Sequence, residues 1–361
     1  MSDDDSWRPT ASLAALRMRA ELLHAVREFF RSRAYLEVET PVMSRDVVVD
    51  AWLEPYSTST RWLADERSTC DAHASDVDGT ELFLQTSPEF AMKRLLAAGA
   101  EAIFQVSRVM RQGELGRLHN PEFTMLEWYR VGDTHHEQMA FTEELVRHVF
   151  DRAATLHRDK SATDLSRTPP RLPPDPFTRM TYDKAFERYA GTRVLSLSVP
   201  ELAALASTLR IEAPASLAPI EEERDAWLNL LLAGAVDPHL GKQRPTFLHD
   251  YPASQAALAK IRPDDPPVAE RFELYIAGIE LCNGYHELTD AAKLRRRIVR
   301  QAALRAKEGR RALPAESRLL AAMEAGLPAC CGVALGFDRL AMLALGADSL
   351  AEVLAFPFER A

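Results

Sequence analysis

The sequence predicts an α+β fold in which strands pair through hairpins and helices pack beside them. Three observations indicate this fold class: apolar side chains at helical spacing in residues 12–33, two strand-like runs joined by a polar loop in residues 104–129, and a hairpin pattern in residues 271–288. The chain has 361 residues, 47% hydrophobic and 27% charged, which is typical of a globular protein with a buried core. This composition excludes collagen-like, low-complexity and disordered chains.

The first part of the chain predicts a helix and several short strands. The amphipathic helix at residues 12–33 leads into a strand at residues 35–40, which Pro41 ends. Residues 1–10 are expected to form a flexible tail, and the Ser-, Thr-, Asp- and Ala-rich residues 57–80 a surface excursion. The elements expected next are a strand at 82–86, a helix at 88–98 closed by Gly99, a strand at 102–110, a polar loop at 112–121 and another strand.

The rest of the chain predicts an interruption followed by a return to strands. Five prolines amid charged residues at 158–177 indicate a connector, and helical stretches at 181–240 indicate an insertion, so the interruption spans about 158–240. The elements expected after it are strands at 271–277 and 279–288 with a turn at Gly278, a helix that Asp290 caps, a glycine-bounded segment at 332–336 and a final helix at 337–345.

The negative net charge of the chain argues against binding of nucleic acid over its surface as a whole. The 44 basic and 53 acidic side chains give 44 − 53 = −9, so nucleic acid would need a local basic patch. The helix after Asp290 carries nine basic residues between Lys293 and Arg311, which form either a solvated face or a docking surface.

Cysteine usage and the N-terminal sequence indicate a cytoplasmic protein. Four cysteines form no C-x-x-C pair, and no zinc-ligand spacing occurs, so the cysteines, His135 and His136 are interpreted as structural. The acidic start does not resemble a signal peptide, and no apolar run is long enough to span a membrane.

The strand pair around residues 104–129 places several functional groups on one face. Phe123, Glu127 and Tyr129 share a face by the two-residue period, and Arg111 ends the preceding strand. Arginine offers forked donors to phosphate and an aromatic ring can stack on a base, so this face suits an anionic, planar ligand. An ordinary amphipathic hairpin is the alternative.

A second cluster is formed by carboxylates in the hairpin at residues 271–288 and just before it. Its members are Glu270, Glu273, Glu280 and Glu287. Glu273 and Glu280 flank the turn, where they could share a hard cation such as Mg²⁺ with substrate phosphates, and Glu287 could pair with a substrate ammonium. The alternative is that these glutamates are solvated on an edge strand. That alternative predicts lysines among the glutamates, and no lysine occurs between Glu270 and Asp290.

The segment GVALGFDRL, residues 332–340, joins small residues to the start of a helix. Glycines allow a ligand close to the backbone, and a helix N-terminus favours phosphate. Alone this is a weak signal, and it matches neither a phosphate-binding loop nor a Rossmann fingerprint.

Together these segments resemble the signature motifs of class II aminoacyl-tRNA synthetases, in particular the lysyl branch. The resemblance covers nearly the whole chain and implies one catalytic domain over residues 1–361, with an antiparallel sheet flanked by helices and a homodimer. The matching segments are LEVETP at 36–41, TSPEF at 86–90, the stretch 111–127 with HNPEFTMLE, ELCNGYHEL at 280–288 and GVALGFDRL at 332–340.

The first motif begins within forty residues, so we expect no N-terminal anticodon-binding domain. In this the chain is similar to the truncated lysyl-tRNA synthetase paralogues, the elongation factor P β-lysine ligases. The resemblance implies that lysine or (R)-β-lysine reacts with ATP to give an acyl adenylate, and that the acyl group passes to the ε-amine of a lysine on elongation factor P. It implies no stable tRNA binding.

The resemblance also implies roles for individual residues. Arg111 would hold the α-phosphate and the substrate carboxylate, Arg339 the triphosphate tail, and Phe123 the adenine. Glu273 and Glu280 would hold magnesium. The other residues expected at the nucleotide are Gln112, Gly113, His119, Asn120, Leu281 and Gly336. Those expected at the amino acid are Ser87, Pro88, Glu89, Tyr129, Asn283, Glu287 and Ala334. Glu89 would face an amine, Glu287 and Tyr129 would receive the distal ammonium, and Asn283 would help to orient the substrate carboxylate.

Two positions depart from the lysyl-tRNA synthetase pattern. Gly113 stands where an acidic residue is usual and Glu114 follows it, so either Glu114 substitutes through a shifted loop or one nucleotide contact is missing. We expect weaker ATP binding rather than inactivity. Ala334 replaces a glycine of the synthetases, as in the paralogue; its methyl group would disfavour an α-ammonium and favour an amine on the β-carbon.

Two other functions remain open at this stage. A lysine-adenylating ligase with another acceptor, tRNA or a small molecule, would need the same adenylation residues. A catalytically inactive synthetase-like sensor is supported only by Gly113, and the presence of Arg111, Arg339, Glu273 and Glu280 argues against it.

Overall fold

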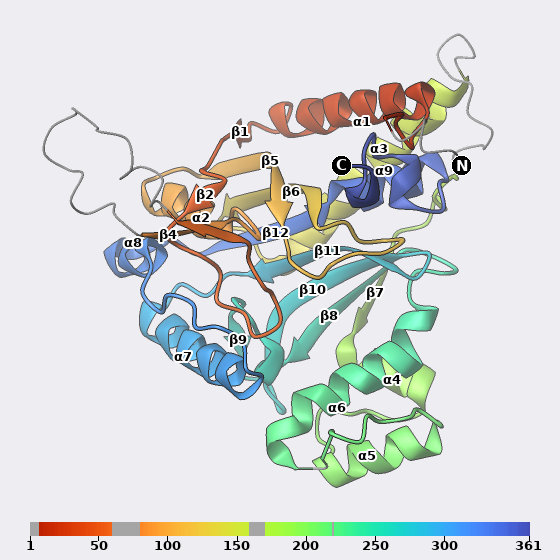
Figure 1. The fold of residues 1–361 in the computed structure, drawn as a ribbon. Helices are drawn as coiled ribbons and strands as arrows, with labels where there is room; N and C mark the ends of the chain where they lie inside the picture. Colours follow the sequence, from red (N-terminus) through yellow and green to blue (C-terminus); the bar gives the residue numbers. More distant parts are fainter. Residues whose placement is uncertain (1–6, 60–79, 159–169, 219) are drawn as a thin grey trace, which may run out of the picture.

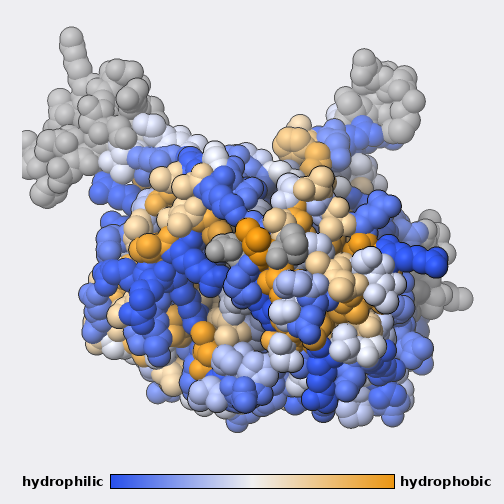
Figure 2. Space-filling view, turned by 90° about the horizontal axis from the view of Figure 1, so that it is seen from below, coloured by the Kyte–Doolittle hydropathy of each residue, from blue (hydrophilic) through white to orange (hydrophobic). Residues whose placement is uncertain are grey.

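The computed structural model describes residues 7–59, 80–158, 170–218 and 220–361. Most of the surface excursion expected at 57–80, more than half of the tail expected at 1–10 and the first part of the expected connector therefore lie outside the described residues. Among the described helices, none is both long and apolar enough to cross a membrane. The face seen in Figure 2 is largely hydrophilic, with apolar residues between the charged ones.

A large sheet forms the centre of the molecule (Figure 1). Its strand order is β1-β5-β6-β12-β11-β10-β8-β7, and β9 pairs with β10. All pairs are antiparallel except β1 with β5 and β7 with β8. The strands are β1 Leu36–Glu37, β5 Ala102–Met110, β6 Glu122–Val131, β7 Thr178–Thr181, β8 Thr246–Pro252, β9 Ile261–Arg262, β10 Val268–Ile276, β11 Ile279–His286 and β12 Cys330–Gly336.

Helices cover both faces of this sheet, and a small second sheet lies near β5. The small sheet has the order β2-β4-β3, with β2 at Met43–Ser44, β3 at Ser57–Ser59 and β4 at Glu81–Leu84. The helices are α1 Leu13–Arg31, α2 Glu89–Ala97, α3 His135–Arg158, α4 Tyr182–Ala190, α5 Val199–Thr208, α6 Arg224–Leu231, α7 Ala291–Lys307, α8 Arg318–Gly326 and α9 Phe337–Leu345.

Three hydrophobic cores hold these layers together. The first lies between the sheet and α1, α3 and α9, where Phe30 of α1 stacks on Phe104 of β5 with ring centroids 4.5 Å apart. The second joins α4, α5 and α6 to β8 and β10, so the predicted insertion packs on the end of the sheet (Figure 1). The third lies under α2, α7 and α8.

The structure confirms most of the predicted elements. Ser12 caps α1 by accepting a hydrogen bond from the backbone of Ala15. The predicted strand at 102–110 and final helix at 337–345 are found with the same bounds. The strand predicted at 35–40 is wrong in length: only Leu36–Glu37 pairs, as a parallel edge to β5, and Leu36 is 61% exposed. Beyond Glu37 the chain leaves this edge towards Pro41, which cannot donate to a strand ladder.

The basic helix α7 is not a purely solvated face. Arg305 is 1% exposed and donates to the backbone oxygens of Asp50 and Leu53 and to the Glu54 carboxylate. Arg297 donates to two backbone oxygens of the loop before β9. Several of its cations therefore fasten α7 over the sheet, where the helix forms one wall of a cavity.

Candidate active site

Two cavities lie along β6, β11 and β12 and meet at three residues. The larger has a volume of about 400 Å³ and the smaller of about 250 Å³. Arg111, Asn283 and Ala334 line both. Because β12 pairs with both β6 and β11, side chains on one face of these three strands point into the same space. The arrangement suits two ligands that react where the cavities join.

The larger cavity has an acidic wall built around a buried lysine. Lys93 of α2 is 1% exposed, and its Nζ lies 2.5 Å from Glu89 Oε1 and 2.5 Å from Glu287 Oε2. Burial alone would lower the pKa of Lys93, but the charges of Glu287 and Glu89 raise it well above its usual range. Lys93 is therefore a permanent cation.

Glu127 adds a third carboxylate to this wall. It accepts hydrogen bonds from the Tyr129 hydroxyl at 2.7 Å and the Ser87 hydroxyl at 2.8 Å. Burial and the charge of Glu89 raise the pKa of Glu127 to about 7, and burial also raises the pKa of Glu287. One lysine cannot neutralise three carboxylates, so the wall retains a charge of 1 − 3 = −2 when all are ionised. It is built to receive cations.

We expect this wall to make the ligand-free protein less stable as pH rises. In the unfolded chain Glu127 ionises near pH 4.5, whereas the folded protein holds the proton to about pH 7. The folded state thus binds more protons in this window, and the Glu127 share of the free energy of unfolding falls by about 3 kcal/mol from pH 4.5 to 7. Thermal unfolding of the parent and Glu127→Gln measures this share; equal pH slopes for the two proteins would contradict the expectation.

The smaller cavity is lined by fixed cations and an aromatic ring. Arg111 lies over the ring of Phe123, 5.1 Å from its centroid, and donates through Nε to the Thr86 backbone oxygen at 3.2 Å. Arg339 donates to the Glu280 backbone oxygen at 2.7 Å, and its Nη2 lies 2.7 Å from His119 Nε2. Burial and the Arg339 charge lower the pKa of His119, so the neutral ring accepts this bond.

Glu280 and Glu273 differ in how far their carboxylates are already used. Glu280 lines the smaller cavity; although its side chain reaches solvent there, surrounding protein and the Glu273 charge raise its pKa to about 7. Glu273 is buried and accepts hydrogen bonds from the hydroxyls of Tyr251 at 2.6 Å and Tyr275 at 2.7 Å. Arg271 pairs with its other oxygen. A cation would stabilise the ionised form of Glu280, and a carboxylate oxygen is a ligand that suits Mg²⁺. The buried Glu273 carboxylate would add negative charge near that ion.

The structure brings most of the predicted site residues to the two cavities. The larger is lined by Ser87, Glu89, Arg111, Tyr129, Asn283, Glu287 and Ala334. The smaller is lined by Arg111, His119, Asn120, Phe123, Glu280, Leu281, Asn283, Ala334, Gly336 and Arg339. Four predicted residues do not line either cavity: Pro88, which caps α2, Gln112 and Gly113 in the exposed loop, and Glu273.

The loop around Gly113 brings Glu114, and not Gly113, to the smaller cavity. Gly113 has φ of +79°, a conformation that favours glycine, and adopts it without lining the cavity. Glu114 does line the smaller cavity, with its Oε1 3.6 Å from Arg111 Nη1. Glu114 is therefore the acidic residue of this loop that lies nearest Arg111 among the described residues.

Two residues of the acidic wall were missed as site residues. Glu127 could have been found, because the two-residue period places it beside Tyr129. Lys93 has a weaker signal, a lysine one helical turn after Glu89, which normally indicates a surface pair. Only the packing of α2 against the sheet shows that it is buried.

The comparisons with known proteins agree with this geometry. A family model described as class II tRNA synthetases (D, K and N) matches residues 5–360, and the chain belongs to this family. Proteins named elongation factor P–(R)-β-lysine ligase are similar over their whole length. The one from Vibrio cholerae is 45% identical over 100% of both chains, that from Klebsiella pneumoniae strain 342 is 43% identical over 100% of both, and that from Vibrio parahaemolyticus is 44% identical over 98% of both.

Proposed function

We propose that this protein activates (R)-β-lysine, or lysine, with ATP as an acyl adenylate and transfers the acyl group to the ε-amine of a lysine on elongation factor P. The observation that carries the proposal is the junction of an acidic cavity and a cationic cavity at Arg111, Asn283 and Ala334. The names and full-length similarity of the relatives support the acceptor.

The residues at the junction account for the first step. The substrate carboxylate attacks the α-phosphorus of ATP, the new C–O–P linkage forms, and pyrophosphate leaves. Arg111 stands at the junction, where its guanidinium can contact the carboxylate and the α-phosphate together. Phe123 offers its ring to adenine, and Arg339 pairs with the distal phosphates. Glu280, with Glu273 beside it, would hold Mg²⁺, which would neutralise charge on the phosphates.

The acidic wall accounts for the choice of amino acid. A lysine isomer carries two ammonium groups, and the wall carries a residual charge of −2 when its three carboxylates are ionised. Glu89 faces one amine; Glu287, Glu127 and Tyr129 receive the distal one. The Asn283 Oδ1 is buried without a hydrogen-bond partner in the described structure, so it can accept from the nearer ammonium. An amino acid with an uncharged side chain would leave the carboxylates of the wall without a cationic partner.

Ala334 is expected to select the position of the nearer amine. Its methyl group projects where both cavities meet. Replacing it with glycine removes that methyl group, and we expect the ratio of adenylation efficiencies for α-lysine over β-lysine to rise roughly tenfold. The two isomers are compared by pyrophosphate exchange; an unchanged ratio would disprove the selection by Ala334.

The remaining parts of the proposal concern assembly and location. Large apolar side chains are exposed near the first motif, with Leu36 61%, Val42 40% and Met43 42% exposed, which supports a homodimer built there. We further propose one catalytic domain, no stable tRNA binding and a cytoplasmic location. The net charge of −9 favours a protein acceptor over tRNA.

Pyrophosphate exchange followed by mass measurement tests the function. Exchange into ATP is measured with (R)-β-lysine, with α-lysine and with no amino acid, and purified elongation factor P is then added. Exchange that depends on β-lysine, with a matching mass gain on the factor, is the expected result. Exchange without modification would point to another acceptor, and no exchange would point to a ligand sensor.

A further inference from the structure

A cluster of histidines and carboxylates lies on the side of β10 and β11 away from the substrate cavity. Arg271 and Glu287 line that cavity, and their chain neighbours Glu270 and His286 point the other way. There His135, the first residue of α3, offers a ligand atom within 4.8 Å of both. His135 also forms a second such group with His249 and Asp250 of β8.

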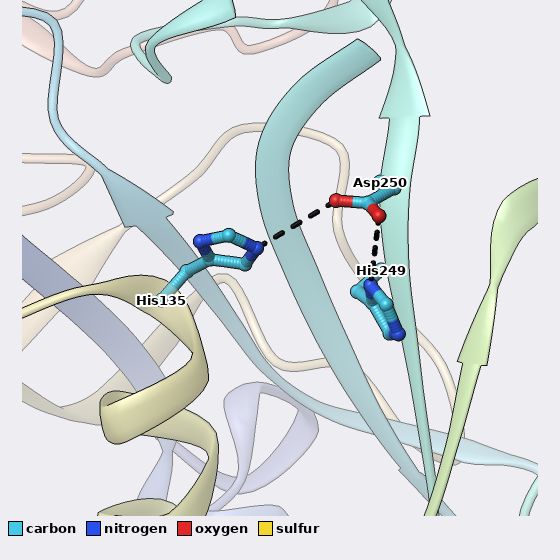
Figure 3. Close-up of side chains that lie close together, drawn as sticks. All are labelled: His135, His249 and Asp250. Atoms are coloured by element: carbon cyan, nitrogen blue, oxygen red, sulfur yellow. Dashed lines mark ion pairs between the residues drawn. The ribbon is translucent and has the colours of Figure 1, made fainter. Parts of the chain in front are cut away.

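The second group converges on the carboxylate of Asp250. Figure 3 shows the rings of His135 and His249 directed at its two oxygens. His135 Nε2 lies 3.6 Å from Oδ1, and His249 Nδ1 lies 3.3 Å from Oδ2. These separations are longer than ordinary hydrogen bonds between nitrogen and oxygen.

Three of the four ring nitrogens of His135 and His249 have no hydrogen-bond partner among the described residues. His135 is 2% exposed, and neither of its ring nitrogens has a hydrogen-bond partner among the described residues. His249 is 8% exposed, and its Nδ1 also lacks one within the described part of the chain. Buried polar atoms are nearly always satisfied, so two such nitrogens facing the Asp250 carboxylate, His135 Nε2 and His249 Nδ1, indicate a ligand there.

The spacing of the ligand atoms fits a tetrahedral transition-metal ion. Nitrogen and oxygen ligands lie about 2.0 to 2.1 Å from Zn²⁺, so two ligands at the tetrahedral angle are about 3.3 Å apart. The separations of 3.3 and 3.6 Å, which run to the two different oxygens of the Asp250 carboxylate, lie close to this value. Two imidazoles and one carboxylate favour zinc and its first-row neighbours over Mg²⁺ or Ca²⁺.

The backbone and a neighbouring arginine hold Asp250 in place. Asp250 has φ of 59° and interrupts β8, so His249 and Tyr251 lie on opposite faces although they are two residues apart. Arg262 donates to both Asp250 oxygens, at 3.2 and 3.0 Å. Such support orients a ligating carboxylate.

We propose that His135, His249 and Asp250 form a site for one first-row transition-metal ion of the Zn²⁺ class. The ion ties the N-terminus of α3 to β8 beneath the substrate cavity. The group of His135, Glu270 and His286 is the weaker candidate, because His286 Nδ1 and Glu270 Oε2 already share a hydrogen bond at 2.6 Å. His135 lies more than one hundred residues before His249 and Asp250, so the ligands do not form a short metal-binding motif. For this reason the sequence analysis interpreted His135 as structural.

Metal binding to the full-length protein tests the site. The protein is titrated with Zn²⁺ and with Co²⁺ in excess Mg²⁺, which occupies sites that prefer hard cations such as Glu280. We expect one Zn²⁺ per chain after gel filtration, a visible Co²⁺ absorption band and a lower melting temperature after chelation. Wild-type protein that retains no Zn²⁺ and shows no Co²⁺ band would overturn the proposal.

Two variants and a control locate the ion. His249→Asn and Asp250→Asn are each expected to weaken Zn²⁺ binding at least about tenfold and to remove the Co²⁺ band. His148→Asn, which replaces an exposed histidine farther along the same helix, is expected to change neither. Equal binding by parent and His249→Asn would show that the ion lies elsewhere. If both variants fail to fold, the Co²⁺ band and the chelation shift of the parent decide.

Discussion

Replacing Arg111 with alanine is expected to lower kcat/KM for amino-acid-dependent pyrophosphate exchange about 100- to 1000-fold, the loss typical of one preorganised transition-state donor. Arg111 alone among the cations of the described residues lines both cavities. Its guanidinium is fixed by the Thr86 backbone oxygen and by the Phe123 ring, so it needs no reorganisation when charge develops on the α-phosphate. The loss should appear mainly in kcat, because the contact strengthens in the transition state.

Arg108→Ala is the matched control for this experiment. Arg108 lies on the same strand, β5, but is exposed and paired only at 3.6 Å with Glu122. An exposed pair of this kind contributes little, so exchange should stay within about twofold of the parent. If Arg111→Ala kept more than a tenth of the parent rate, the junction of the cavities would not be the reacting centre.

Local patterns predicted the parts of the site that lie on one strand. Alternation along β6 placed Phe123 and Tyr129 on one face, and in the structure Phe123 lines the smaller cavity and Tyr129 the larger one. The final helix at 337–345 was predicted because its glycine boundary and apolar spacing are both local signals. Hydrophobic periodicity and helix-boundary residues are set by neighbours a few positions apart, so a single sequence is enough to detect them.

Pairings between distant segments were beyond these patterns. Insertion of β12 between β6 and β11 brings Gly332 opposite both Tyr129 and Tyr285, although β6 and β12 are far apart in the chain. Burial of Lys93 depends on how α2 packs over the sheet, and its neighbours in the chain give no sign of it. The position of Asp250 depends on a left-handed residue inside a strand. The resemblance to a family supplied roles for residues that the patterns alone did not bring together.

The Gly332→Ala variant is expected to abolish most binding of the amino acid while leaving ATP binding intact. A Cβ at Gly332 would overlap the Tyr129 ring and lie 2.5 Å from Glu287 Oε1. The Tyr129 ring and the Glu287 carboxylate cannot easily move away from this Cβ. The Tyr129 hydroxyl donates a hydrogen bond to Glu127 of the acidic wall, and the Glu287 carboxylate is paired with Lys93. Displacing them should raise KM for the amino acid at least about 100-fold, roughly the loss of one well-placed charged contact.

Separate measurements on the two cavities distinguish this effect from unfolding. ATP binding is followed by calorimetry without amino acid, and the amino-acid KM by pyrophosphate exchange. Cys331→Ala is the control: it changes the adjacent residue of β12, which points to the other face, and adds no atom. We expect it to bind both ligands like the parent. An unchanged amino-acid KM in Gly332→Ala would mean that Tyr129 and Glu287 do not hold the substrate ammonium, because the overlap forces both to move.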